Sequence, residues 1–143
     1  MLKKTITYES YDGVKYTEDF YFNLSRAEII EMECGVKGGF TKKLESISKS
    51  SDPTQIMPVF KDIILKSYGK KSDDGKRFIK SAEISTEFEQ SEAYSELMVE
   101  LLKDAKAASD FINGLVNINP EELEEAKKRA NISALPTAAA VTE

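Results

Sequence analysis

The segment Leu2–Leu24, LKKTITYESYDGVKYTEDFYFNL, predicts how the chain begins to fold. Apolar and polar residues alternate along this segment, which indicates a β-hairpin over residues 2–22 with one buried face. The Asp12-Gly13 pair at its centre supplies residues that tolerate the positive φ angles of a tight turn. An isolated hairpin is marginally stable, so its apolar face must pack on other parts of the chain. The residues of that face are Leu2, Ile6, Tyr8, Val14, Tyr16, Phe20 and Phe22.

A capping box predicts the start of the first helix, directly after the hairpin. Ser25 and Glu28 have its spacing, and Leu24 and Ile29 have the spacing of a hydrophobic staple. We expect the helix to end near Gly35, which can take a left-handed conformation at the C′ position.

Five more helices are predicted from apolar residues three and four positions apart. One covers Phe40 to Ile47, and the others start at Asp52, Ser81, Ser91 and Asp104, which are N-cap residue types. The Ser91 helix should turn Tyr94, Leu97, Met98, Leu101 and Leu102 inward. Asp104 should cap or bend a continuation through Ala105, Ala108, Phe111, Ile112 and Leu115.

Two segments interrupt these helical patterns. Pro58 lies inside the helix that Asp52 starts, and we expect it to kink or restart that helix. After a polar turn, Arg77–Lys80 is either extended or a loop that inserts apolar side chains into the core, and we favour the loop.

The elements together predict an α+β fold that is mostly α: an N-terminal β-hairpin packed on a bundle of about five or six short helices, with a flexible C-terminal tail. Residues 1–116 should form a single globular domain, with the helices within 25–116. Residues 117–130 carry few apolar side chains and should form a weakly docked helix. Residues 131–143 should be a disordered tail.

The composition excludes much catalytic chemistry. The chain has no His and one Cys, Cys34, so it holds no Ser-His or Cys-His nucleophile pair and no Cys/His zinc site. The glycine cluster Gly35–Lys43 lacks the Gly-Lys-Ser/Thr order of a phosphate loop, and Asp73-Asp74-Gly75 lacks the alternating carboxylates of a calcium loop. We therefore assign no catalytic, cofactor-binding or metal-binding residue, and partner-binding residues stay unknown.

Charge is distributed unevenly along the chain, whose net charge is -5. Residues 1–80 carry 15 basic and 12 acidic residues, a balance of +3, whereas residues 81–143 carry 5 and 13, a balance of -8. The acidic part includes a row of Glu92, Glu96 and Glu100, which should face solvent or a basic partner. The net charge makes binding to nucleic acid unlikely, although residues 37–80 have 11 basic and 5 acidic residues, with Tyr68 and Phe78 available for stacking on RNA bases.

Several segments resemble the tail assembly chaperones of long-tailed, siphovirus-type bacteriophages, in their shorter, non-frameshifted product. The similarity covers about residues 1–116. The segments are Thr17–Leu24 running into an acidic helix, Phe60–Gly69, Asp74–Ser81, and Ser91–Tyr94 through Asp110–Gly114.

The resemblance implies a non-enzymatic chaperone without a cofactor. Such a protein binds and solubilises the tape measure protein before tail tube subunits polymerise around it. The resemblance also implies a homo-oligomer, co-assembly with a longer frameshifted form, a place in the cytoplasm of the infected or lysogenic host, and absence from the mature virion. No membrane contact is expected. The alternatives are a structural tail or neck subunit, and a small nucleic-acid-binding protein that uses residues 37–80.

If the basic and acidic parts occupy different faces, the uneven charge predicts head-to-tail self-association that weakens as salt is added, because opposite charges on neighbouring copies are screened. The alternative is an acidic helix surface that simply faces solvent. Sedimentation at low and high salt measures this. A monomer that sediments identically in both conditions contradicts the prediction.

Overall fold

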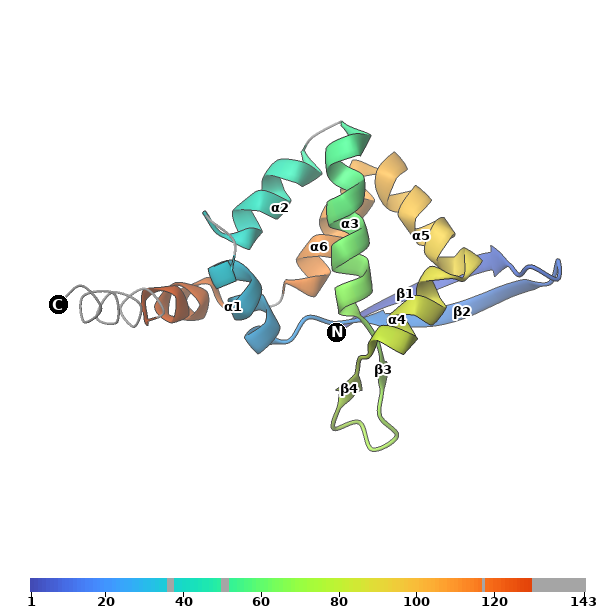
Figure 1. The fold of residues 1–143 in the computed structure, drawn as a ribbon, viewed down its shortest axis with the longest axis horizontal. Coiled ribbons are helices and arrows are strands. Elements are labelled where there is room, and N and C mark those ends of the chain that lie inside the picture. The colour runs from blue at the N-terminus through green and yellow to red at the C-terminus, as the bar shows by residue number, and fades with distance from the viewer. Residues whose placement is uncertain (36–37, 50–51, 117, 130–143) are drawn as a thin grey trace.

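A computed structural model describes residues 1–35, 38–49, 52–116 and 118–129. It confirms an α+β fold that is mostly helical, with an N-terminal β-hairpin packed on helices (Figure 1). The strands form one sheet in the order β1-β2-β3-β4, and each neighbouring pair is antiparallel. The elements in chain order are β1 Leu2–Glu9, β2 Lys15–Phe22, α1 Arg26–Gly35, α2 Phe40–Ser48, α3 Pro53–Ser67, β3 Tyr68–Lys71, β4 Phe78–Ile79, α4 Ala82–Glu89, α5 Glu92–Lys103 and α6 Ala105–Leu115.

The N-terminal hairpin pairs β1 with β2 from Leu2 opposite Phe22 to Glu9 opposite Lys15. The Ser10 N–H donates to the Val14 carbonyl at 2.8 Å, and the Gly13 N–H donates to the Ser10 carbonyl at 2.9 Å. Gly13 has a φ of 80°, but no non-glycine residue in the described chain has a positive φ. The expectation that Asp12 would share the left-handed conformation is therefore wrong, because in this turn only Gly13 adopts it.

The second hairpin, β3 with β4, widens the sheet beyond the expected two strands. Tyr21 of β2 pairs with Gly69, and Lys71 pairs with Phe78. A Cβ on Gly69 would lie 2.7 Å from the Ile79 carbonyl oxygen and from the Phe78 ring, so glycine permits the close approach of β4. The loop favoured for residues 77–80 is wrong: Phe78 and Ile79 form a short strand and are half-buried at the sheet.

The helix boundaries follow the predicted caps, although the Ser91 side chain makes no capping hydrogen bond at the start of α5. In the capping box, the Glu28 N–H donates to Ser25 Oγ at 3.1 Å and the Ser25 N–H donates to Glu28 Oε1 at 3.0 Å. Asp52, Ser81 and Asp104 also accept backbone N–H groups at the starts of α3, α4 and α6. Helix α3 runs without restarting through Pro58.

The glycines after α1 differ from their prediction. Gly35 is the last residue of the helix and its φ is not positive, so the expected left-handed C′ residue at that position is wrong. Positive φ angles occur later, at Gly38 with 83° and Gly39 with 94°. The change of chain direction before α2 therefore uses these two residues.

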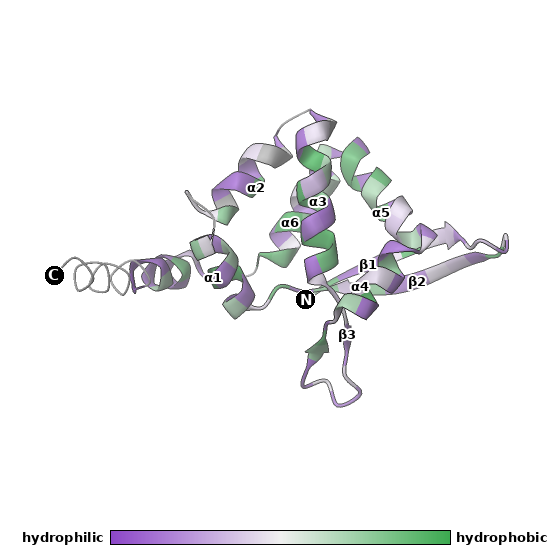
Figure 2. Cartoon of the chain, in the orientation of Figure 1, coloured by the Kyte–Doolittle hydropathy of each residue, from purple (hydrophilic) through white to green (hydrophobic). Residues whose placement is uncertain are grey.

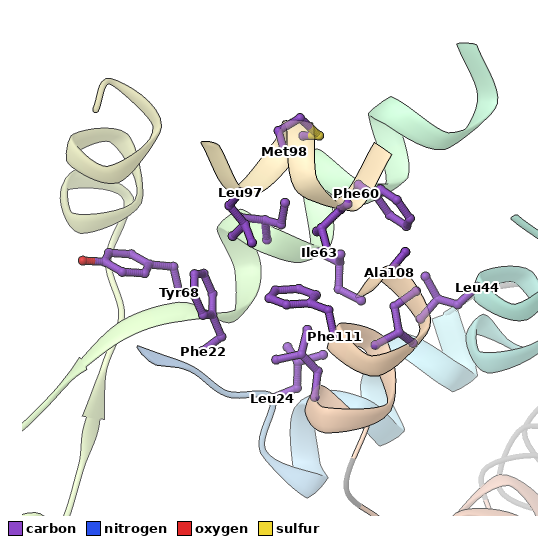
Figure 3. Close-up of a cluster of buried hydrophobic side chains, with 14 of the residues drawn as sticks. Phe22, Leu24, Leu44, Phe60, Ile63, Tyr68, Leu97, Met98, Ala108 and Phe111 are labelled. Atoms are coloured by element: carbon purple, nitrogen blue, oxygen red, sulfur yellow. The ribbon is translucent and has the colours of Figure 1, made fainter. Parts of the chain in front are cut away.

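The core lies between the sheet and helices α3, α4, α5 and α6 (Figure 3). Phe22, Ile63 and Leu97 have no exposed surface, and Phe111 is 3% exposed. In Figure 2, hydrophobic residues (green) and hydrophilic residues (purple) occur on the same turns of α3 and α6. This is expected of amphipathic helices with one buried face. In α5, Leu97, Met98 and Leu101 are buried as predicted, whereas Leu102 is exposed.

The hairpin extends beyond the helices that cover its base (Figure 1). Ile6 and Phe22 are buried, but Val14 is 48% exposed and Tyr16 44% exposed on the same face. The predicted apolar residues do share one face of the hairpin. Only the half of that face nearest the core is buried.

Residues 120–129 form a further helix beside α1. Its Leu123 is 8% exposed, Glu122 forms an ion pair with Arg26 at 3.2 Å, and Lys127 Nζ lies 3.5 Å from Glu33 Oε1. The predicted tail, residues 131–143, lies outside the described residues. Among the helices of the described part, none is long and apolar enough to cross a membrane.

Two leucines of α5 offer a matched test of the packing. Leu97→Ala should lower the free energy of unfolding by about 2–5 kcal/mol, because it leaves a cavity where the side chain is fully buried. Leu102→Ala, in the same helix but exposed, should change it by about 0.5 kcal/mol or less. Urea denaturation measures both, and equal losses would contradict this placement of α5.

Candidate partner-binding surface

In the described part of the glycine cluster, Gly39 lies beside an acidic side chain. Gly39 lies against the Glu33 carboxylate, which is 4% exposed, and an added Cβ on Gly39 would collide with Glu33 Oε1. Lys127 from the helix at 120–129 faces the same carboxylate. A phosphate at Gly39 would lie against this carboxylate, which disfavours anion binding at that glycine.

The Asp73-Asp74-Gly75 segment forms the turn between β3 and β4. Asp74 Oδ1 accepts from Ser72 Oγ at 2.7 Å and from the Lys76 N–H at 3.0 Å. These hydrogen bonds to the Asp74 carboxylate stabilise the turn. They also lower the pKa of Asp74, and the bond from the Ser72 hydroxyl contributes most. No group of three or more potential metal ligands occurs among the described residues.

The basic region does not present aromatic rings for stacking on bases. Tyr68 is 8% exposed and stacks on Phe88 with ring centroids 4.3 Å apart, inside the core. Phe78 is half-buried, and Lys80 Nζ lies 5.8 Å from its ring centre. The two rings proposed for RNA binding therefore serve the packing of the sheet.

The largest of the hollows described here is a groove beside α3, with a volume of about 610 Å³. Its other wall is the junction of β4 and α4. Leu65, Pro58 and Ala82 supply apolar surface, and the Ser85 hydroxyl donates to the Leu65 carbonyl at 3.0 Å. The lining is completed by Lys61, Asp62, Lys66, Lys80 and Ser81.

A second hollow, of about 410 Å³, lies on the other side of α3. Met32 of α1 and Phe40 of α2 give it apolar surface, and both are half-buried. Asp62 and Lys66 line both hollows, so the exposed face of α3 forms a ridge between them. This surface has the concave, partly apolar form that suits a helical segment of another protein.

Ion pairs hold the lysines at the rim of the α3–α4 groove. Lys61 Nζ lies 3.0 Å from Glu89 Oε2, and the hydrogen bond to Glu89 and its charge raise the pKa of Lys61. Lys66 pairs with Asp62 one turn away at 3.4 Å. Because exposed ion pairs are weak, these side chains can exchange partners when a ligand arrives.

Lys80 makes the most constrained of these contacts. Its Nζ donates to both Glu28 carboxylate oxygens at 2.8 Å, which links the start of α4 to the start of α1. Partial burial raises the pKa of Glu28, but the hydrogen bond from Lys80, the backbone bond from Ser25 and the Lys80 charge outweigh it, and the pKa lies below its ordinary value. Glu28 thus caps one helix and positions one wall of the groove.

Sequence reasoning did not find this surface. Its lining comes from α3 and from residues 80–85. These overlap the segments Phe60–Gly69 and Asp74–Ser81 of the family resemblance, which assigned no residue to partner binding. Pro58 and Ala82 were the available signals in the sequence, and neither residue specifically indicates a binding surface.

The geometry describes a concave, partly apolar surface, and no group of three or more potential metal ligands occurs among the described residues. A sequence model of the family described as phage tail assembly chaperone matches residues 1–143. The chain belongs to this phage tail assembly chaperone family. No curated protein and no solved structure matches it. The family match extends past residue 116, where the resemblance noted in the sequence ended.

The Glu28–Lys80 contact makes the stability of this phage tail assembly chaperone depend on pH. Since the pKa of Glu28 is lowered by folding, the stabilisation is complete above the unfolded pKa and is lost as pH falls through the folded pKa. Glu28→Gln keeps a cap acceptor but removes the charge, so urea denaturation should show a smaller loss of stability between pH 7 and pH 3 than in the wild type. Glu31→Gln, exposed on the same helix, is the control and should follow the wild type.

Proposed function

We propose that this phage tail assembly chaperone binds the tape measure protein and keeps it soluble until tail tube subunits polymerise around it. The observation that carries the proposal is the family match over residues 1–143. The groove between α3 and α4 supports it, because it gives the chain a surface suited to a protein segment.

The proposed mechanism is the covering of apolar helix faces. A long helical protein exposes repeated apolar stripes before its own assembly is complete, and such stripes aggregate in water. A groove of about 610 Å³ accommodates the side chains of one helix face, with Leu65 and Pro58 against the apolar stripe and the rim lysines towards flanking polar groups. Several copies along one tape measure protein would bind it more tightly than single copies do, because linked binding sites raise the effective concentration of one another.

The remaining features of the proposal follow from this role. The chaperone acts without catalysis or a cofactor, in the cytoplasm of the infected or lysogenic host, and leaves before the virion is finished. It self-associates and co-assembles with a longer frameshifted form. These points rest on the family and on its partners in tail assembly.

Co-expression with the tape measure protein of the same phage tests the proposal. We expect a soluble complex that co-purifies, whereas the tape measure protein alone should be insoluble. Ala82→Trp fills the groove with a large ring and should weaken the complex roughly tenfold, about 1.4 kcal/mol. Ala105→Trp is a matched control, because Ala105 is also exposed and also the first residue of its helix, but lies outside the groove.

Light scattering of the co-purified material measures the stoichiometry. A tape measure protein that stays insoluble beside soluble chaperone would contradict the proposed function. A complex that Ala82→Trp and Ala105→Trp affect equally would retain the function but place the contact elsewhere. Detection of the chain in finished virions would favour a structural subunit.

A further inference from the structure

The outer edge of β2 is open along most of its length. On one side β2 pairs with β1 from Lys15 to Phe22. On the other side it pairs with β3 at Tyr21 and Phe22 alone. Within the described chain, no strand covers the edge from Lys15 to Phe20.

The register identifies the backbone groups that this edge presents. In an antiparallel ladder, hydrogen-bonded pairs alternate with non-hydrogen-bonded pairs. The Ser10–Val14 bond places the even-numbered residues of β2 in the bonded pairs with β1. The odd-numbered residues therefore point their N–H and C=O groups to the outer edge, as the pairing of Tyr21 with Gly69 shows. Lys15, Thr17 and Asp19 are the odd-numbered residues for which the described chain supplies no such strand.

The sheet leaves room beside this edge. After Gly69, β3 turns away from β2 to pair with β4, and a hollow of about 380 Å³ lies in the resulting fork. Glu18 and Asp19 line one side of the fork, and Lys70 and Lys71 line the other. A strand placed along Lys15–Asp19 would enter this fork from its open end.

The face of the hairpin next to the open edge is also uncovered. Val14 and Tyr16 are about half exposed, and Tyr16 stacks on Tyr8 with ring centroids 5.8 Å apart. An exposed edge that adjoins an apolar face is a template for pairing with another strand. The edge and the apolar surface thus lie together on the part of the hairpin that extends beyond the helices (Figure 1).

We propose that the edge pairs with the same edge of a second copy, antiparallel, about a two-fold axis through Thr17. In this register Lys15 lies opposite Asp19 of the other copy, and the reverse pair repeats the contact. Opposite charges in directly facing positions stabilise an antiparallel pair. The outward-pointing backbone groups of Lys15, Thr17 and Asp19 then all form hydrogen bonds with the other copy. Thr17 pairs with Thr17, and Lys15 pairs with Asp19.

Neighbouring registers fit less well. An axis through Glu18 would place the two Glu18 carboxylates opposite each other and would require the backbone of Tyr21, which is already paired with Gly69. An axis through Tyr16 would place Lys15 opposite Thr17 and Asp19 opposite Gly13, so both charge pairs would be lost. The charges and the end of the free edge therefore select the axis at Thr17.

The same register covers one of the two exposed apolar residues of the hairpin, Val14. Val14 of one copy lies opposite Phe20 of the other, so each exposed valine meets a half-buried ring. The turn of the second copy reaches the fork near Lys70 and Lys71, where Gly13 and Asp12 must bend away from β2 because Tyr21 and Phe22 are already paired with Gly69 and Tyr68. The two hairpins become one continuous sheet, and the interface closes on itself as an isologous dimer.

The test uses two proline variants that differ only in the edge they block. Thr17→Pro removes an N–H from the open edge of β2, whereas Thr7→Pro removes one from the outer edge of β1. Thr7 and Thr17 face each other, and each variant loses the same 2.9 Å hydroxyl contact, so their effects on the hairpin itself are matched. In sedimentation equilibrium, the wild type and Thr7→Pro should have twice the mass of the chain, and Thr17→Pro the mass of one chain.

Cross-linking tests the register and does not depend on the proline variants folding. In a Cys34→Ser background, Thr17→Cys should form an interchain disulfide, because Cα atoms of a hydrogen-bonded pair lie about 5.5 Å apart, within disulfide range. A mixture of Lys15→Cys and Asp19→Cys chains should cross-link, whereas Lys15→Cys alone should not. Cross-linking of Lys15→Cys with Thr17→Cys in preference to Asp19→Cys would overturn the register.

Other outcomes would overturn the dimer itself. These are a wild type that is monomeric at all concentrations, a dimeric Thr17→Pro variant, or loss of the dimer in Thr7→Pro instead. A monomeric wild type whose Thr17→Pro variant alone loses the tape measure protein would give the edge to a strand of that partner. The sedimentation and cross-linking experiments need no tape measure protein, so their failure would overturn this interface without deciding whether the chain binds the tape measure protein.

Discussion

The packing of Phe22 at the end of β2 is the contact on which the rest of the structure depends. Its side chain is fully buried, and its ring centroid lies 5.6 Å from that of Tyr68, 5.7 Å from that of Phe88 and 5.3 Å from that of Phe111. These rings belong to β2, β3, α4 and α6, so one aromatic cluster joins the sheet to helices distant in the chain (Figure 3). Aromatic rings dominate such cores because each buries a large apolar area.

The position of this cluster decides which surfaces stay available for partners. It holds the helices over the base of the N-terminal hairpin, so the half that carries Val14 and Tyr16 extends into solvent. It also brings α4 beside α3, where the gap between the two helices becomes the groove. The proposed surfaces for the tape measure protein and for a second copy therefore share no residue.

The distribution of charge along the sequence differs from its distribution in the folded molecule. The basic first part and the acidic second part fold against each other through Lys4 with Glu100 at 3.1 Å, Arg26 with Glu122 at 3.2 Å and Lys61 with Glu89 at 3.0 Å. Glu100, one member of the predicted acidic row, thus meets a basic partner on β1. Part of the uneven charge is neutralised within one molecule, which leaves less of it for association between copies.

The sequence by itself determined the local elements: the hairpin register, the capping box at Ser25 and Glu28, and the amphipathic stripes of α5 and α6. These depend on backbone geometry and on side chains a few residues apart, so their period and caps can be read directly. Only the tertiary structure decided the pairing of Tyr21 with Gly69, the groove lined by Leu65 and Ala82, and the free edge at Thr17. These features join or separate segments that are distant in the chain, and packing across the whole core selects them, which no local pattern encodes.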